Sequence, residues 1–217
     1  MSIYMTRDEQ AVATRQKLLE IAIALLCEGG YGALTSTGVS ARAGLTRGAF
    51  QHHFPDRLAL LRAVVDETTA ELMKLPVAYP GESIRERIDA AIDRYWEFFR
   101  SPSYTAIVQL SLGNLKEVAA RRWLAEEIDR SQALLDRKWH DAFSETGAPP
   151  QQIRSARLLV LAALRGFVML GHHRHQEADW SRELALLKEM LFLALTTDIG
   201  AASRRSHPAK KPRRGGV

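Results

Sequence analysis

The sequence predicts an all-α protein of about nine helices, and two observations lead to that fold class. Nearly every segment with a clear hydrophobic period repeats at three- and four-residue spacing, which marks one face of a helix. No run keeps the two-residue alternation of a half-buried strand. Apolar residues make up 46% of the 217 residues, which is enough for a packed core.

Capping and breaking residues divide the N-terminal part into four helices. Thr, Asp and similar side chains accept hydrogen bonds from the first turn of a helix, whereas Gly and Pro end one. The predicted caps are Thr35, Thr46 and Asp56, and the predicted breaks are Gly29-Gly30, Gly44 and Phe54-Pro55. The helices are therefore expected at residues 8–28, 36–42, 47–52 and 57–75.

Five further helices follow a break at residues 76–81. Short segments rich in Ser, Gly and Pro separate them. They are predicted at residues 83–100, 104–113, 115–144, 151–175 and 181–199. We expect an N-terminal domain at 1–57, a helix at 57–75 that bridges, a C-terminal domain at 76–200, and a disordered basic tail at 201–217.

The net charge of +5 is unevenly distributed. Residues 201–217 carry six basic residues and no acidic one, so residues 1–200 hold 24 basic against 25 acidic residues. Within the body, residues 35–62 contain four arginines against one aspartate. This local excess, rather than the overall pI, is the electrostatic signal for a nucleic-acid partner.

Residues 34–61 have the pattern of a helix-turn-helix. Two short helices that cross steeply need a small residue and a glycine at their turn, here Ala43 and Gly44, followed by the apolar Leu45. The second helix of such a motif begins with small or polar side chains, because its first turn enters the DNA major groove. The run from Thr46 to Ala49 fits that requirement.

Two phenylalanines define the expected orientation of this second short helix. Phe50 and Phe54 are predicted to anchor it against the neighbouring helices. Arg47, Gln51 and His52 would then point outward, where DNA can reach them.

Over residues 14–65 the sequence resembles the tetracycline-repressor (TetR) family of regulators. The matching features are Gly30-Tyr31 after the first helix, the cap Thr35, the run from Val39 to Gly44, and the run from His52 to Arg57. Two positions depart from the family pattern: His52 stands where Tyr or Trp is usual, and Arg57 where Lys is usual. Both side chains keep a hydrogen-bond donor for a phosphate.

The resemblance implies roles for individual side chains. Thr35, His52, His53 and Arg57 would hold phosphates, and Arg47 and Gln51 would read base edges, because Arg pairs with guanine and Gln with adenine. Gly48 and Ala49 would allow a close approach to the groove. Thr35 and Thr46 would cap their helices in either case. The predicted DNA-binding set is Thr35, Thr46, Arg47, Gly48, Ala49, Gln51, His52, His53 and Arg57.

The last two helices are apolar around more than one face, so they need burial on more than one side. The resemblance implies that they pair with their copies in a second subunit; the alternative is a core within one chain. The predicted interface residues are Leu158, Leu161, Ala162, Arg165, Leu184, Leu187 and Leu191.

Aromatic residues between positions 95 and 123 are the expected lining of an apolar ligand cavity, with core packing as the alternative. The predicted ligand-binding set is Trp96, Phe99, Tyr104, Gln109, Asn114, Trp123, Arg165 and His172. The resemblance implies that a small molecule bound there shifts the helix at 57–75 and thereby displaces the reading helices.

These features predict a ligand-responsive transcription regulator, a repressor that binds a palindromic DNA operator as a homodimer and is released by a small-molecule effector. The alternative is a non-specific or architectural nucleic-acid-binding protein that uses the basic tail. No enzyme is expected, because no nucleophile elbow, phosphate loop or paired-carboxylate motif is present.

Metal, cofactor and membrane roles are not expected either. Neither His52 with His53 nor His172 with His175 has the further ligands that a metal site needs, and the single Cys27 excludes an intrachain disulfide. No apolar run approaches the roughly 18 residues of a membrane span, and the first ten residues lack a secretory pattern. We therefore expect a cytoplasmic protein without a cofactor or a membrane partner.

Overall fold

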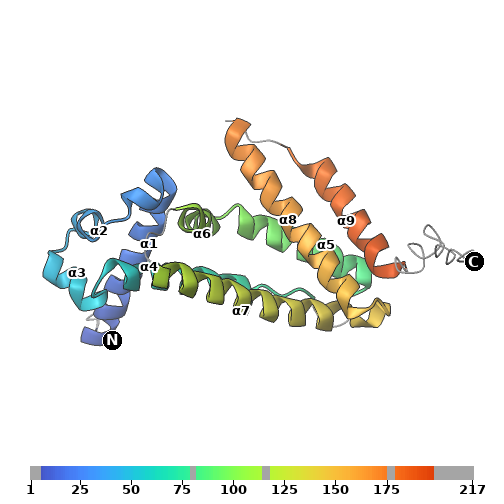
Figure 1. The fold of residues 1–217 in the computed structure, drawn as a ribbon, viewed down its shortest axis with the longest axis horizontal. Helices are drawn as coiled ribbons and strands as arrows, with labels where there is room; N and C mark the ends of the chain where they lie inside the picture. The colour runs from blue at the N-terminus through green and yellow to red at the C-terminus, as the bar shows by residue number, and fades with distance from the viewer. Residues whose placement is uncertain (1–5, 79–81, 114–117, 175–178, 198–217) are drawn as a thin grey trace, which may run out of the picture. The chain divides into compact units, whose positions relative to one another are not determined.

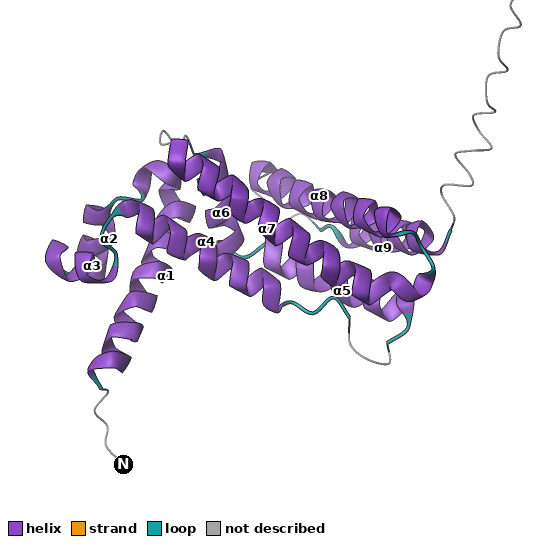
Figure 2. Cartoon of the chain, turned by 60° about the horizontal axis from the view of Figure 1, so that its bottom comes forward, coloured by secondary structure: helices purple, strands orange, loops and turns teal. Residues whose placement is uncertain are grey.

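The computed structural model describes residues 6–78, 82–113, 118–174 and 179–197, with the side chains of 118–120 and 172–174 excepted. Within these ranges every regular element is a helix, which confirms the predicted fold class (Figures 1 and 2). The elements are α1 (Arg7–Ala33), α2 (Ser36–Ala43), α3 (Arg47–His53), α4 (Arg57–Lys74), α5 (Ile84–Phe99), α6 (Pro102–Leu112), α7 (Val118–Phe143), the 3-10 turn η1 (Ser144–Thr146), α8 (Pro150–Arg174) and α9 (Ser181–Thr196).

The first helix differs from its prediction at its C-terminal end. Gly30 has a φ of 65° and leaves helical geometry, but the chain then resumes helical hydrogen bonding as far as Ala33. The predicted stop is thus an interruption. Glycine suits this position for two reasons: the positive φ strains other residues, and a Cβ there would lie 3.1 Å from Oε1 of Gln109.

The described residues fall into two compact units. The first contains Met1–Pro76 and Arg94–Leu135, and the second contains Val77–Asp93 and Asp136–Val217. The functional domain limits stay a prediction, and the tail at 201–217 lies outside the described residues. No helix of the described ranges is long and apolar enough to cross a membrane.

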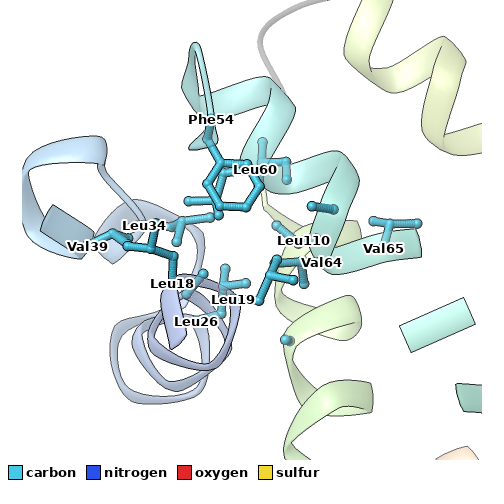
Figure 3. Packing of buried hydrophobic residues seen from close by; sticks show 14 of the residues in the cluster. Leu18, Leu19, Leu26, Leu34, Val39, Phe54, Leu60, Val64, Val65 and Leu110 are labelled. Carbon is cyan, nitrogen blue, oxygen red and sulfur yellow. The ribbon is translucent and has the colours of Figure 1, made fainter. Parts of the chain in front are cut away.

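The core of the first unit fixes the short helices α2 and α3. In this unit α1 packs on α2, α4 and α6. Side chains from all of these helices meet in one buried cluster, together with Phe54, which follows α3 directly (Figure 3). The cluster includes Leu18, Leu19, Leu26, Leu34, Val39, Phe50, Phe54, Leu60, Val64 and Leu110. Because α3 is only seven residues long, this packing and not its own hydrogen bonds must hold it in place.

The second unit has its own core, which contains a buried arginine. Arg157 of α8 is 0% exposed, and its Nε and Nη2 donate to Oδ1 of Asp136 at 2.9 and 2.6 Å. Trp139 and Phe143 follow Asp136 on α7, and their ring centroids are 5.4 Å apart. A buried charge needs such a partner, because removing the carboxylate would leave a desolvated guanidinium.

Candidate nucleic-acid interface

Two threonines and a glycine fix the ends of α2 and α3. The Thr35 hydroxyl accepts a hydrogen bond from the Gly38 amide at 3.0 Å, and the Thr46 hydroxyl accepts one from the Ala49 amide at 3.1 Å. Gly44 ends α2 with a φ of 71°, in the left-handed region that favours glycine. The expected capping geometry is present at both threonines, and each hydroxyl keeps its O–H for another acceptor.

The inner side of α3 is held by two aromatic side chains. Phe50 and Phe54 are 0% and 1% exposed, and their ring centroids are 5.9 Å apart. The guanidinium of Arg15, on α1, lies over the Phe54 ring at 4.7 Å. These contacts orient α3 in the way the sequence predicted.

The opposite side of α3 is presented to solvent. Arg47, Gly48, Gln51 and His52 are exposed, while Ala49 is half-buried. A Cβ added to Gly48 would meet nothing closer than the Thr46 hydroxyl oxygen at 4.0 Å. Packing within the chain therefore does not require a glycine there, whereas close approach of an outside partner would.

The four arginines of residues 35–62 differ in the contacts that they make. Arg42 forms an ion pair with Glu28, with N–O distances of 2.5 and 2.7 Å. Arg57 donates from Nη2 to the Tyr31 carbonyl at 2.7 Å, and its guanidinium lies 4.1 Å from the Tyr31 ring centroid. Arg62 lies over the Trp123 ring at 5.4 Å.

Arg47 is the member of this group that makes none of these contacts. It is exposed and has no hydrogen-bond or ion-pair partner in the part of the chain that the structure describes. Arg57, predicted to hold a phosphate, has one donor committed to Tyr31 and a buried Nε without a partner among the described atoms.

The two histidines at the end of α3 differ in environment. His52 is exposed and His53 is half-buried, with ring centroids 5.5 Å apart. Burial, and then the charges of His52 and Arg15, lower the pKa of His53 below its ordinary value. Across the described residues, no group of three or more His, Cys, Asp or Glu side chains is placed to hold a metal ion.

The structure brings together only part of the predicted ligand-binding set. Phe99 and Tyr104 are in edge contact at 4.7 Å, while Trp96 lies under the Arg100 guanidinium and Trp123 under that of Arg62. Gln109 lies beside Gly30, and Arg165 belongs to the second compact unit. Asn114 and the side chain of His172 lie outside the described part.

A hollow of about 410 Å³ lies between the end of α6 and the first half of α7. None of the predicted ligand-binding residues lines it. Its lining consists of Ser111, Leu112, Gly113, Arg121, Leu124, Ala125 and Ile128.

The predicted interface residues of α8 and α9 divide into buried and accessible ones. Leu161, Leu187 and Leu191 are buried within the single chain. Leu158 and Ala162 are exposed, and Arg165 and Leu184 are half-buried. The large apolar side chains that these helices expose are Leu158, Leu159, Met169, Leu170, Leu186, Met190 and Leu193. Helical periodicity indicated two apolar faces but could not tell which one meets the chain's own core.

Comparison with known proteins shows a family likeness in the N-terminal helices. Residues 18–64, which contain α2, α3 and the buried phenylalanines, match the family model described as bacterial regulatory proteins, tetR family.

Other relatives extend the likeness beyond residues 18–64. The HTH-type transcriptional regulator CymR of Pseudomonas putida is 26% identical over 172 residues, 76% of this chain and 82% of CymR. Among solved structures, NalD, the secondary repressor of the MexAB-OprM multidrug efflux pump in Pseudomonas aeruginosa, has a TM-score of 0.65 at 17% identity, covering 88% of this chain and 99% of NalD. A SmeT–triclosan complex has a TM-score of 0.65 at 21% identity, covering 86% of this chain and 93% of SmeT. NalD and SmeT share the fold of this chain, while CymR is named a transcriptional regulator and NalD a repressor.

Proposed function

The chain is a transcription regulator of the tetR family, and on that premise we propose that it binds a palindromic operator as a homodimer and releases it when a small-molecule effector binds. Repression is the direction we propose, because NalD, which shares the fold, is a repressor. The observation that carries the proposal is the outward face of α3, where Arg47, Gly48, Gln51 and His52 are exposed while Phe50 is buried behind them.

That face has the chemistry of direct base recognition. Arg47 offers a guanidinium that matches the O6 and N7 acceptors of guanine, and Gln51 offers an amide that matches adenine. Gly48 adds no side-chain bulk at the centre of the face. The hydroxyls of Thr35 and Thr46, together with His52 and His53, would contact backbone phosphates around it.

A homodimer supplies the second reading helix that a palindrome requires. The exposed leucines and methionines of α8 and α9 form the surface that we assign to the subunit contact, because so many large apolar side chains on two adjacent helices favour burial against a partner. A two-fold dimer would read half-sites about 34 to 36 Å apart or a multiple of that spacing.

Effector release requires a ligand with unequal affinity for two conformations. A tenfold loss of operator affinity corresponds to about 1.4 kcal/mol of preference for the conformation that does not fit DNA. The SmeT–triclosan complex is a small-molecule complex of a protein with the same fold. Apolar phenols titrated into a preformed complex with labelled operator are suitable first probes, with DNA release followed by fluorescence anisotropy.

Selection from a pool of duplexes with a randomised core tests the DNA-binding proposal. The full chain should enrich duplexes with an inverted repeat. Enrichment of no common sequence would contradict operator recognition, and binding of all duplexes alike would favour the non-specific alternative that uses the basic tail.

Replacing Arg47 by alanine is expected to relax base preference at one position of each half-site. Loss of a bidentate guanine contact costs about 1 to 3 kcal/mol of discrimination. The measurement is competition binding with single-base variants of the selected duplex. Arg42→Ala is the matched control. The Arg42 guanidinium is already paired with Glu28, so its removal should leave base preference unchanged. Equal effects of the two substitutions would contradict the role of Arg47.

Operator affinity is expected to rise as the pH falls from about 8 to about 6. The pKa of His53 is lowered in the free protein by burial and by His52 and Arg15. A bound phosphate favours the protonated form and raises that pKa, so binding takes up a proton between the two values. The affinity gain therefore grows as the pH falls through the pKa of the complex and levels off below the pKa of the free protein.

His53→Gln should reduce this pH dependence, measured as operator affinity across the same range. His140→Gln, at an exposed histidine of α7, is the control and should retain it. A pH profile that is the same in both variants would remove His53 from the phosphate contacts.

A further inference from the structure

The N-terminal half of α1 extends beyond the helix-turn-helix core. Every residue of α1 from Arg7 to Lys17 is exposed except the half-buried Thr14, and the first buried residues are Leu18 and Leu19. Figure 2 shows these first turns of α1 running out past α2 and α3. Side chains at the base of this extension, close to Leu18, are therefore next to α3 and open to solvent.

Arg15 lies at the base of this extension, against Phe54 at the end of α3. Its guanidinium carbon lies 4.7 Å from the ring centroid of Phe54, the C-cap residue of α3. A guanidinium that stacks on a ring through its face keeps its N–H groups directed outward at its edge. The Arg15 N–H groups have no hydrogen-bond or ion-pair partner within the described ranges.

Among the cations of this extension, Arg15 is the best placed to bind a phosphate. Arg7 shares the first turn with Asp8 and Glu9, whose carboxylates repel a phosphate backbone. Lys17 donates from Nζ to the Ala43 carbonyl at 3.1 Å, at the end of α2. Arg15 is thus the α1 cation that is both beside α3 and uncommitted to another group.

We propose that Arg15 binds a backbone phosphate of the operator beside the C-terminal end of α3, which extends the DNA interface from the helix-turn-helix onto α1. This inference rests on the proposed function and adds a contact to it. The stacked fork of a guanidinium can hold two oxygens of one phosphate, so Arg15 would fix the register of α3 along the duplex without reading a base.

The charge of Arg15 also reaches the neighbouring histidine. It contributes to lowering the pKa of His53, after burial and the charge of His52. A phosphate bound by Arg15 would offset this effect, because a nearby negative charge favours the protonated imidazole.

The test compares Arg15→Met with Arg7→Met on the selected duplex. Methionine can keep apolar contact with Phe54, and it removes the charge together with the N–H donors of the guanidinium. For Arg15→Met we expect binding roughly five- to tenfold weaker at about 0.1 M salt, and a plot of log affinity against log salt that is shallower by about one unit for each bound protomer. Arg7→Met should stay within about twofold of the parent chain, and Arg15→Lys should restore the salt slope.

The possible outcomes distinguish failure of the Arg15 contact from failure of the proposed operator binding. If the parent chain binds the selected duplex and Arg15→Met keeps the parent salt slope, the Arg15 contact is overturned while operator binding stands. If the parent chain selects no duplex, both fall together. A lower affinity with an unchanged slope would show that Arg15 acts through the packing of Phe54 only, which also overturns the proposal.

Discussion

Replacing Leu159 by glutamate is expected to convert the proposed homodimer into monomers and to abolish its proposed tight binding to an operator. Leu159 is 72% exposed on α8, among the apolar side chains assigned to the subunit contact. In a two-fold interface each substitution occurs twice. Burial of a leucine contributes about 1.5 to 3 kcal/mol, so two lost leucines weaken the dimer by at least a hundredfold, and the two buried carboxylates weaken it further.

The measurement is sedimentation equilibrium, with the 24.3 kDa chain mass as the monomer reference. Leu112→Glu is the matched control, because Leu112 is a leucine of nearly the same exposure, 71%, but lies on α6. It should leave the subunit mass unchanged. A Leu159→Glu chain that stays dimeric, or a Leu112→Glu chain that dissociates, would show that the subunits meet elsewhere.

Replacing Phe50 by alanine is expected to destabilise the N-terminal helices severely. Phe50 is 0% exposed and belongs to the buried cluster that joins α1, α2, α4 and α6. A Phe to Ala change in such a core costs about 3 to 5 kcal/mol, from the lost burial and from the cavity that remains. That is a large part of the roughly 5 to 15 kcal/mol that stabilises a typical domain.

Urea unfolding measures this loss as a midpoint lower by about 1 to 3 M. Gln51→Ala is the adjacent control, since Gln51 is exposed and its truncation should leave the midpoint nearly unchanged while altering base preference. The two neighbouring positions thus separate stability from recognition. An unchanged midpoint for Phe50→Ala would contradict the anchoring role that both sequence and structure assign to it.

The sequence by itself determined the helical elements and the helix-turn-helix. The three predicted caps, Thr35, Thr46 and Asp56, each accept an amide hydrogen bond at the start of a helix in the structure. Gly44 ends α2 as predicted. These features follow from local chemistry, because a cap, a left-handed glycine and a helical apolar period involve residues only a few positions apart. Gly30 breaks helical geometry where the sequence predicted a stop, and a further helical turn follows it as far as Ala33.

Tertiary structure alone decided which of these side chains are available to a partner. A count of charges treats the arginines of residues 35–62 alike, but their contacts differ. Arg42 is paired with Glu28 and Arg57 donates to the Tyr31 carbonyl, whereas Arg47 is paired with no described group. Likewise Leu161 is buried in the chain's own core and Leu159 is exposed, although both lie on one apolar helix. Arg15 comes beside Phe54 across 39 positions of sequence. Burial and ion pairing depend on groups that are distant in sequence and close in space, so periodicity and charge counts identify the candidates, and only the packed chain selects among them.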